Sequence, residues 1–431
     1  TDSKSLSVLL SAAAVRQRCR WILEAARAGT LNHFVYDDSV LDDCAQIVAQ
    51  ETRTNYPDLV VPYHSRWRHF ETPAGDLSDL LLDYVGASDD GRCRAELDLV
   101  FISVLLDAGA GGRWQYRDDD TGMVYHRSEG LAVASIRMFV AGLFSSDPAS
   151  PCQVDSDALI ALDVNGLKSG FKANGDNPLP GLAERTLLLN RLGEVLADSV
   201  ATGLCRPCDW ILDNLGERPV TADHLLAVVL THLNPIWPQG HIEDGVALGD
   251  VGYHPVACSA EEFPGLVPFH KLSQWLTYSL IEPLARGGIE VCELNGLTGL
   301  AEYRNGGLFL DCGVIQADGA ALTHQPLAVA SEIVVEWRAL TIALLDELAP
   351  RVRQLLALNE DDFPLACLLQ GGSWSAGGRL AQQRRPDGSA PLAAEGAVRP
   401  ANRHRPRVLF DRSLRKNARP PKNVFCDAKI L

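Results

Sequence analysis

The sequence predicts a mainly α fold, a single helical domain over residues 1–385 that carries a small β-hairpin. Two observations favour this class. Apolar residues recur at helical spacing over many long stretches, and strand-like alternation is rare. Strand and helix patterns do not alternate along the chain and no internal repeat is visible, so neither a parallel α/β sheet nor a solenoid is expected.

The elements follow in order along the chain. Residues 113–127 alternate around Asp120-Thr121-Gly122 and predict the hairpin, a second strand is suspected within 306–316, and 234–268 is loop-rich. The last expected helix is either continuous or broken near Pro350. The helices are expected over residues 4–28, 38–51, 92–111, 128–144, 155–172, 181–199, 205–215, 221–233, 269–286 and 330–358.

Charge and composition bound the function. The formal net charge is −16, although residues 391–431 hold ten Lys or Arg against three Asp or Glu. The body is therefore strongly acidic, which argues against nucleic-acid binding, and residues 386–431 read as a basic, disordered or atypical tail. No apolar run approaches the roughly 20 residues of a membrane span. The eleven scattered cysteines favour a reducing, cytoplasmic setting.

Motifs for cofactors and metals are sparse. The spacing Cys205-Arg-Pro-Cys208 is half of a zinc or redox motif, but no second pair stands at metal-like spacing, so structural cysteines are favoured. No nucleotide-binding loop and no serine-hydrolase elbow occurs. We expect neither a cofactor nor a metal.

Two polar segments are candidates for ligand binding. "YHSRWRHF" (63–70) gathers His64, Arg66 and Trp67, which suits an anionic or ring-shaped ligand, or else forms a loop with Trp67 in the core. The glycine-rich stretch 162–181 offers Lys168 and Lys172, which either hold a phosphate or stand exposed in an interhelical loop.

The helix expected over 269–286 is more informative. Lys271, Gln274 and Tyr278 share one face of it, and Lys271 lies in the first turn, where backbone N–H groups favour anions. Glu302 follows 31 residues later beside Arg304. A carboxylate held between these cations would stay ionised, whereas a surface ion pair would contribute below about 1 kcal/mol.

At these residues the chain resembles the uracil-catabolism protein four family of fungi and bacteria. The matching blocks are "YHSRWRHF", "SVLLDAGAGGRWQY", "ALDVNGLKSGFKANGDNPLPG", "PFHKLSQWLTYSLIEPL", "GLAEYRNGGLFLDCGV" and "LLQGGSWSAGGRLA". They run from about residue 60 to residue 380. The resemblance implies a step of pyrimidine breakdown that ends in urea.

A more distant resemblance, to queuosine-salvage N-glycosylases, rests on "FHKLSQ" and "LTGLAEYR". It places Phe269, Lys271 and Gln274 on one motif and Glu302, in place of a catalytic Asp, on the other. It implies a fold like that of the helical DNA glycosylases. The sequence departs again after Arg304, where Asn305-Gly306-Gly307 stands.

Together these features predict an N-glycosidase acting on ribosylurea or its 5′-phosphate. Glu302 would stabilise an oxocarbenium-like centre and orient water, with Asp311 or Asp163 as a second acid. The expected binding residues are Lys271, Gln274, Tyr278, Arg304, Lys168, Lys172, His64, Arg66, Trp67, Trp114 and His270.

Two alternatives stay open. One is a metal-dependent ureide hydrolase using His64, His69, His254 or His270, although no HxH or HExxH spacing occurs. The other is a non-catalytic partner of another enzyme of the pathway. The expected ligand is a small ribosyl compound, with no nucleic acid or membrane partner, and the sequence gives no oligomeric state.

Overall fold

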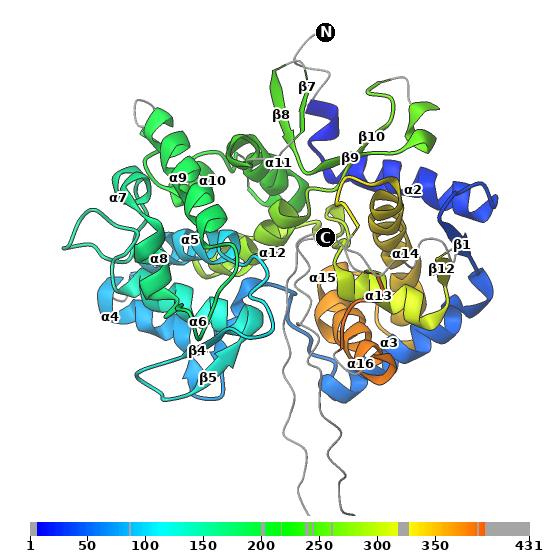
Figure 1. Cartoon of the computed structure of the whole chain (residues 1–431), viewed down its shortest axis with the longest axis horizontal. Helices are drawn as coiled ribbons and strands as arrows, with labels where there is room; N and C mark the ends of the chain where they lie inside the picture. Colours follow the sequence, from blue (N-terminus) through cyan, green and yellow to red (C-terminus); the bar gives the residue numbers. More distant parts are fainter. Residues whose placement is uncertain are drawn as a thin grey trace, which may run out of the picture.

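A computed structural model describes residues 7–85, 88–199, 203–216, 218–237, 241–243, 245–259, 262–317, 327–385 and 388–392. It confirms the mainly α class. Helices α4 to α11 gather on the left of Figure 1, and α2, α3 and α13 to α16 gather on the right. Helix α12 lies between the two groups (Figure 1). No helix in the described ranges combines the length and apolarity that a bilayer crossing requires.

The helices agree with most of the expected stretches. They are α2 (Ala12–Arg27), α3 (Leu41–Asn55), α4 (Leu82–Val85), α5 (Asp89–Leu105), α6 (Arg127–Val140), α7 (Ser156–Ala161), α8 (Val164–Gly170), α9 (Leu182–Ser199), α10 (Pro207–Leu212), α11 (Ala222–Leu233), α12 (Lys271–Arg286), α13 (Tyr303–Cys312), α14 (Glu332–Leu356), α15 (Leu365–Leu368) and α16 (Trp374–Arg384).

The single helix expected over 155–172 is wrong, because the chain breaks there into α7 and α8. Leu162 leaves the helical region, and the Asp163 side chain caps the next helix by accepting a hydrogen bond of 2.8 Å from the Gly166 N–H. Such a cap stabilises a new helix start instead of continuing the old one. Helix α14, in contrast, is continuous through Pro350.

The strands are short and form two-stranded pairs. They are β1 (Phe34–Tyr36), β2 (Glu71–Thr72), β3 (Gly75–Asp76), β4 (Gln115–Arg117), β5 (Val124–His126), β6 (Val220–Thr221), β7 (His241–Glu243), β8 (Val246–Gly249), β9 (Val251–Tyr253), β10 (Leu266–Pro268), β11 (Val291–Cys292) and β12 (Ile315–Ala317). The hairpin β4–β5 is confirmed, with Tyr116 opposite Tyr125. The pair β1–β12 joins segments about 280 residues apart.

The strand suspected within 306–316 is wrong over most of its length, because residues 303–312 form α13. Gly306 lies inside α13, at the point where this helix packs directly against α14. A Cβ at that position would lie 2.7 Å from Thr341 Oγ1 and from Trp337 Nε1. The glycine therefore permits a close helix contact, not a turn.

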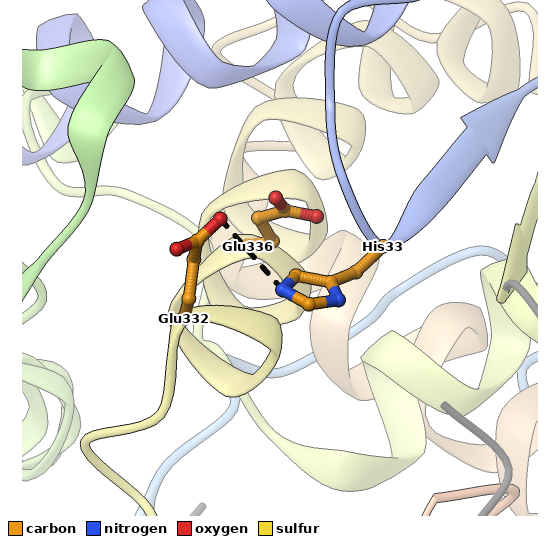
Figure 2. A group of neighbouring side chains, drawn as sticks. All are labelled: His33, Glu332 and Glu336. Atoms are coloured by element: carbon orange, nitrogen blue, oxygen red, sulfur yellow. Dashed lines mark ion pairs between the residues drawn. The ribbon is translucent and has the colours of Figure 1, made fainter. Parts of the chain in front are cut away.

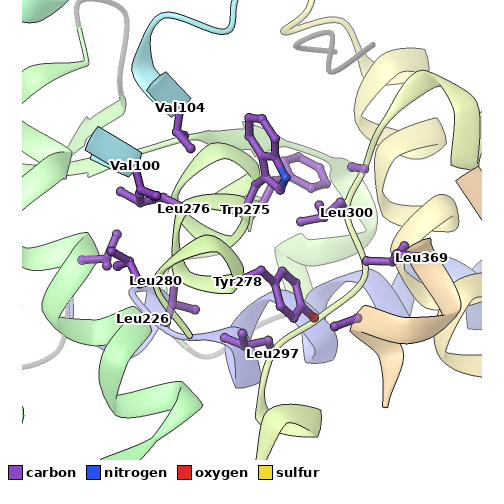
Figure 3. Packing of buried hydrophobic residues seen from close by; sticks show 14 of the residues in the cluster. Val100, Val104, Leu226, Trp275, Leu276, Tyr278, Leu280, Leu297, Leu300 and Leu369 are labelled. Atoms are coloured by element: carbon purple, nitrogen blue, oxygen red, sulfur yellow. The ribbon is translucent and has the colours of Figure 1, made fainter. Parts of the chain in front are cut away.

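The core joins the two groups of helices across α12. Leu276 and Leu280 of α12 meet Val100 of α5 on one side, and Leu297 and Leu300 lie on the other side near Tyr278 (Figure 3). On the right of Figure 1, α14 packs between α2 and α3. This arrangement brings the start of α12 close to the start of α13.

Candidate functional site

The candidate site forms where the first residues of α12 and α13 meet the segment that begins at His64. Glu302 is the residue immediately before α13, and its backbone carbonyl accepts the Gly306 N–H at 2.8 Å. Its side chain does not cap the helix and is only 1% exposed. The carboxylate is thus buried away from its own helix end.

The two oxygens of Glu302 have different surroundings. Oε1 lies 3.8 Å from His64 Nε2, which is beyond hydrogen-bond distance. Oε2 is buried and has no hydrogen-bond partner among the described residues. A buried carboxylate oxygen without a donor is costly, and active sites are where such atoms are expected.

Electrostatics keep this carboxylate charged. Burial by itself would raise the pKa of Glu302, but His64 and then the positive charges of Lys271 and Arg304 outweigh it, so the pKa lies below its usual range. Burial lowers the pKa of Lys271, and the nearby Glu302 charge offsets part of that effect. The site therefore holds a buried anion among cations.

His64 is oriented by the turn that precedes α16. Its Nδ1 lies 3.1 Å from Gln370 Oε1, and Gln370 Nε2 donates to the Tyr56 hydroxyl at 3.1 Å. Because an amide oxygen only accepts, His64 Nδ1 donates a proton to Gln370, and the opposite ring nitrogen, Nε2, faces Glu302. Gln370 lies in a π-helical turn, Leu369–Ser373, a feature frequent at functional sites.

Arg304 is held by aromatic side chains. Its Nε donates to the Tyr303 hydroxyl at 3.0 Å, and its guanidinium carbon lies 4.4 Å from the centre of the Trp374 ring. Helix α16 passes so close that a Cβ at Gly377 would collide with the Arg304 backbone carbonyl. Stacking and close packing together fix the position of this cation.

Gln274 and Tyr278 fasten α12 to the segment that leads to Glu302. Gln274 Oε1 accepts the Thr298 N–H at 2.9 Å, and Gln274 Nε2 donates to Thr298 Oγ1 at 2.7 Å. The Tyr278 hydroxyl donates to the Thr298 carbonyl at 3.0 Å. Both side chains are fully buried, so this geometry makes them positioning residues.

The start of α12 is fixed from behind by Asp250. Its Oδ2 accepts the Lys271 N–H at 3.1 Å, and both its oxygens accept from Arg338 at 2.8 and 2.6 Å. His270 precedes Lys271 in a left-handed conformation, with Nε2 lying 2.9 Å from the Leu9 carbonyl. His270 therefore belongs to the support of the site.

A buried polar cluster adjoins Lys271. Arg66 is fully buried, donates to Asp107 Oδ2 at 2.9 Å and to Ser103 Oγ at 2.6 Å, and lies 3.3 Å from His69 Nδ1. The Asp107 charge also acts on Lys271. Burial, followed by the charge of Arg66, holds the pKa of His69 well below its usual range. Trp67 donates its indole N–H to the Ser279 carbonyl at 2.8 Å and packs in the core.

Five of the predicted site residues interact with other groups or with solvent instead of with Glu302. Asp163 caps α8 at an exposed position, and Lys168 is exposed on the same helix. Lys172 binds Asp119 and the Arg117 carbonyl, beside the hairpin. The remaining two are buried: Trp114 donates to the Phe171 carbonyl, and Asp311 forms a two-pronged pair with Arg385 at 2.8 and 2.6 Å.

Other residues at the site were not singled out from sequence. They are Asp107, Asp250, Arg338, Gln370 and Trp374. Asp107 and Arg338 end or interrupt apolar helices, so periodicity assigned those stretches to the core. Gln370 and Trp374 lie in the block "LLQGGSWSAGGRLA", where the family resemblance was the available signal.

Metal-binding geometry occurs elsewhere in the described residues. The group of His, Cys, Asp or Glu side chains found there with suitable spacing is His33, Glu332 and Glu336. It includes none of the four histidines considered for a ureide hydrolase. Cys208 is buried, which raises the pKa of its thiol, and its N–H donates to Asp98, whereas Cys205 is exposed.

Comparison with known proteins gives consistent matches over nearly the whole chain. A family model described as "Protein of unknown function (DUF1688)" matches residues 8–397. "Protein urg3" of Schizosaccharomyces pombe is 38% identical over 400 residues, covering 89% of this chain and 96% of that protein. "Uracil catabolism protein 4" of Lachancea kluyveri is 35% identical over 445 residues, covering 92% and 100%. These matches confirm the resemblance to the uracil-catabolism protein four family.

Proposed function

We propose, from the premise that the chain belongs to the DUF1688 family, that it acts in uracil catabolism as an N-glycoside hydrolase. The substrate would be ribosylurea or its 5′-phosphate. Water would add to the anomeric carbon while the bond from that carbon to the urea nitrogen breaks. The products are urea and ribose or ribose 5-phosphate, and the proton released by water ends on the urea nitrogen.

The observation that carries this proposal is the state of Glu302. It is a fully buried carboxylate whose pKa lies below the usual range, with Oε2 lacking a partner in the described structure. Cleavage of an N-glycoside builds positive charge on the sugar. A preorganised anion stabilises that charge without reorganisation, and its free oxygen is suited to accept a proton from the attacking water.

The cations around Glu302 support a phosphorylated substrate. Lys271 and Arg304 both place positive charge near Glu302, which favours an anionic group beside them. An Arg held by stacking and a Lys at a helix start are frequent phosphate ligands. Lys168 and Lys172, in the region of α8 and the hairpin, stay predictions separate from this site.

Replacing Glu302 by Gln tests the assignment. The change removes the charge and keeps the shape, so we expect urea release from ribosylurea 5-phosphate to fall at least about 100-fold. A coupled urea assay on the full chain measures the rate, and circular dichroism checks folding. Glu347→Gln is the matched control, because Glu347 pairs with Arg27 and Arg351 at the surface.

Full activity in Glu302→Gln would remove Glu302 from the mechanism. Absence of turnover by the unmodified chain on every ribosyl compound, together with co-purification of another pathway enzyme, would favour the non-catalytic alternative instead.

A further inference from the structure

Side chains from two segments distant in sequence meet at the start of α14. His33 stands just before β1, and Glu332 and Glu336 occupy the first two turns of the helix (Figure 2). One ligand atom from each lies within 4.8 Å of the others. These residues take no part in the site at Glu302.

Glu336, the most buried residue of the three, has a carboxylate oxygen whose partner is not identified. Glu336 is 0% exposed, and its Oε2 has no hydrogen-bond partner among the described residues. A buried carboxylate oxygen without a donor is costly, so a ligand is expected to satisfy it. The neighbouring carboxylate of Glu332 makes a further anion nearby and raises that cost.

The other oxygen of Glu336 is already oriented. His254 Nδ1 accepts the Val256 N–H at 3.2 Å, so its Nε2 carries the proton and donates to Glu336 Oε1 at 3.1 Å. An outer hydrogen bond to a ligating carboxylate is the usual arrangement around protein-bound metals. His254 thus leaves Oε2 for another partner.

Glu332 and His33 complete the group at its more exposed side. Asn32 Nδ2 donates to Glu332 Oε1 at 2.8 Å, whereas His33 Nε2 lies 3.7 Å from the same oxygen. That separation is too long for a hydrogen bond, but it suits two ligands of one ion. The nearest arginine along the helix, Arg338, is engaged by Asp250.

We propose that His33, Glu332 and Glu336 bind one divalent transition-metal ion of the zinc class, with water filling the remaining positions. One imidazole nitrogen and two carboxylates make a borderline donor set that suits Zn²⁺ or Mn²⁺ better than Ca²⁺. Ligands about 2.0–2.2 Å from Zn²⁺ require only a small inward movement of these side chains. The ion would fasten the segment before β1 to α14.

The site also connects to the support of Lys271. Glu336 and Arg338 are two residues apart on α14. Arg338 donates to Asp250, which in turn accepts the Lys271 N–H. His254 follows Asp250 after β9. The ion would therefore affect Lys271 only through the packing of these residues. Its binding does not depend on the proposed glycosidase reaction.

Titration of the full chain with ZnCl₂ after dialysis against a chelator tests the proposal. We expect one equivalent to bind in calorimetry and to raise the melting temperature, since an ion bound only by the folded state stabilises it. Glu336→Gln and the more exposed Glu332→Gln should each weaken binding at least tenfold. Mn²⁺ serves as a second probe.

Glu243→Gln is the matched control, because Glu243 pairs with His241 in a separate surface contact and should bind Zn²⁺ as the unchanged chain does. Should Glu336→Gln fail to fold, Glu332→Gln alone decides the question. No saturable binding, or equal binding in Glu332→Gln, overturns the proposal. In that case a water molecule at Glu336 Oε2 is the remaining explanation.

Discussion

At the level of single residues, the proposed chemistry depends on two buried groups of opposite charge, Glu302 and Lys271. Burial favours the neutral form of each group, but each stabilises the charged form of the other. The pKa of Glu302 lies below the usual value of about 4.3, so its charge persists as the pH falls to that value. Acid conditions down to about pH 5 should therefore leave Glu302 ionised.

We expect Lys271 to set the alkaline limit of the proposed activity. Because its pKa is lowered from the usual value of about 10.4, its charge is lost as the pH rises through a lower value. We expect kcat/KM for ribosylurea 5-phosphate to decline on that side. Lys271→Arg should move the decline to higher pH, since a guanidinium keeps its charge. A pH profile from 5 to 11 measures this, and an unshifted decline would exclude Lys271 as its cause.

Asp311 has an ion-pair partner that the sequence did not indicate. Predicted as a second acid, it lies 4% exposed in a two-pronged pair with Arg385. We expect Asp311→Asn to lower the free energy of unfolding by about 2 kcal/mol while kcat stays within about threefold. Urea denaturation and steady-state kinetics separate the two effects. A loss of kcat as large as that in Glu302→Gln would restore a catalytic role.

At the level of elements, much of the helical pattern was predictable, because a long apolar stripe at helical spacing survives tertiary packing. The failures have local causes. Asp163 starts a new helix, and Gly306 serves a close helix contact that a sequence cannot distinguish from a turn. Motif order and family resemblance predicted, in outline, that four residues would converge: Glu302, Lys271, His64 and Arg304.

The sequence alone did not show which elements, far apart along the chain, contact one another in the fold. A polar, glycine-rich stretch such as 162–181 has the same sequence features whether it faces the site or solvent. The group His33, Glu332 and Glu336 spans about 300 residues, so no spacing motif marks it. Gln274 was assigned to substrate from its helix face, whereas its partner Thr298 lies in another segment.

The close approach of α16 to α13 is a testable element of the site. Gly377→Ala should push α16 from the Arg304 backbone, costing about 1–3 kcal/mol and reducing kcat/KM, because Arg304 would shift. Gly175→Ala is the matched control, since a Cβ there meets nothing within 4 Å. Thermal unfolding and kinetics measure both variants. Equal stability of the two would contradict this packing.

At the level of the whole molecule, two groups of helices share α12, and the site lies at its first turn. The family match ends at residue 397, and Leu392, beyond the boundary predicted at 385, is 3% exposed. The rest of the predicted tail, 393–431, lies outside the described residues. Within the acidic body, Lys271 and Arg304 place positive charge at the candidate site, which would suit an anionic ligand.

Truncation tests where the folded body ends. A chain ending at residue 397 should keep its melting temperature and kcat/KM, because it retains every described residue. A chain ending at residue 384 should melt at lower temperature, since it lacks Arg385, which holds Asp311, and the buried Leu392. Differential scanning fluorimetry compares them. A destabilised 397 chain would show that later residues contribute to the fold.

The most direct test of the central claim is the rate of urea release from ribosylurea 5-phosphate by Glu302→Gln relative to the unchanged chain and Glu347→Gln. The account predicts a fall of at least about 100-fold in Glu302→Gln, with folding intact and the control unaffected. Urea release by Glu302→Gln at the rate of the unchanged chain would contradict it.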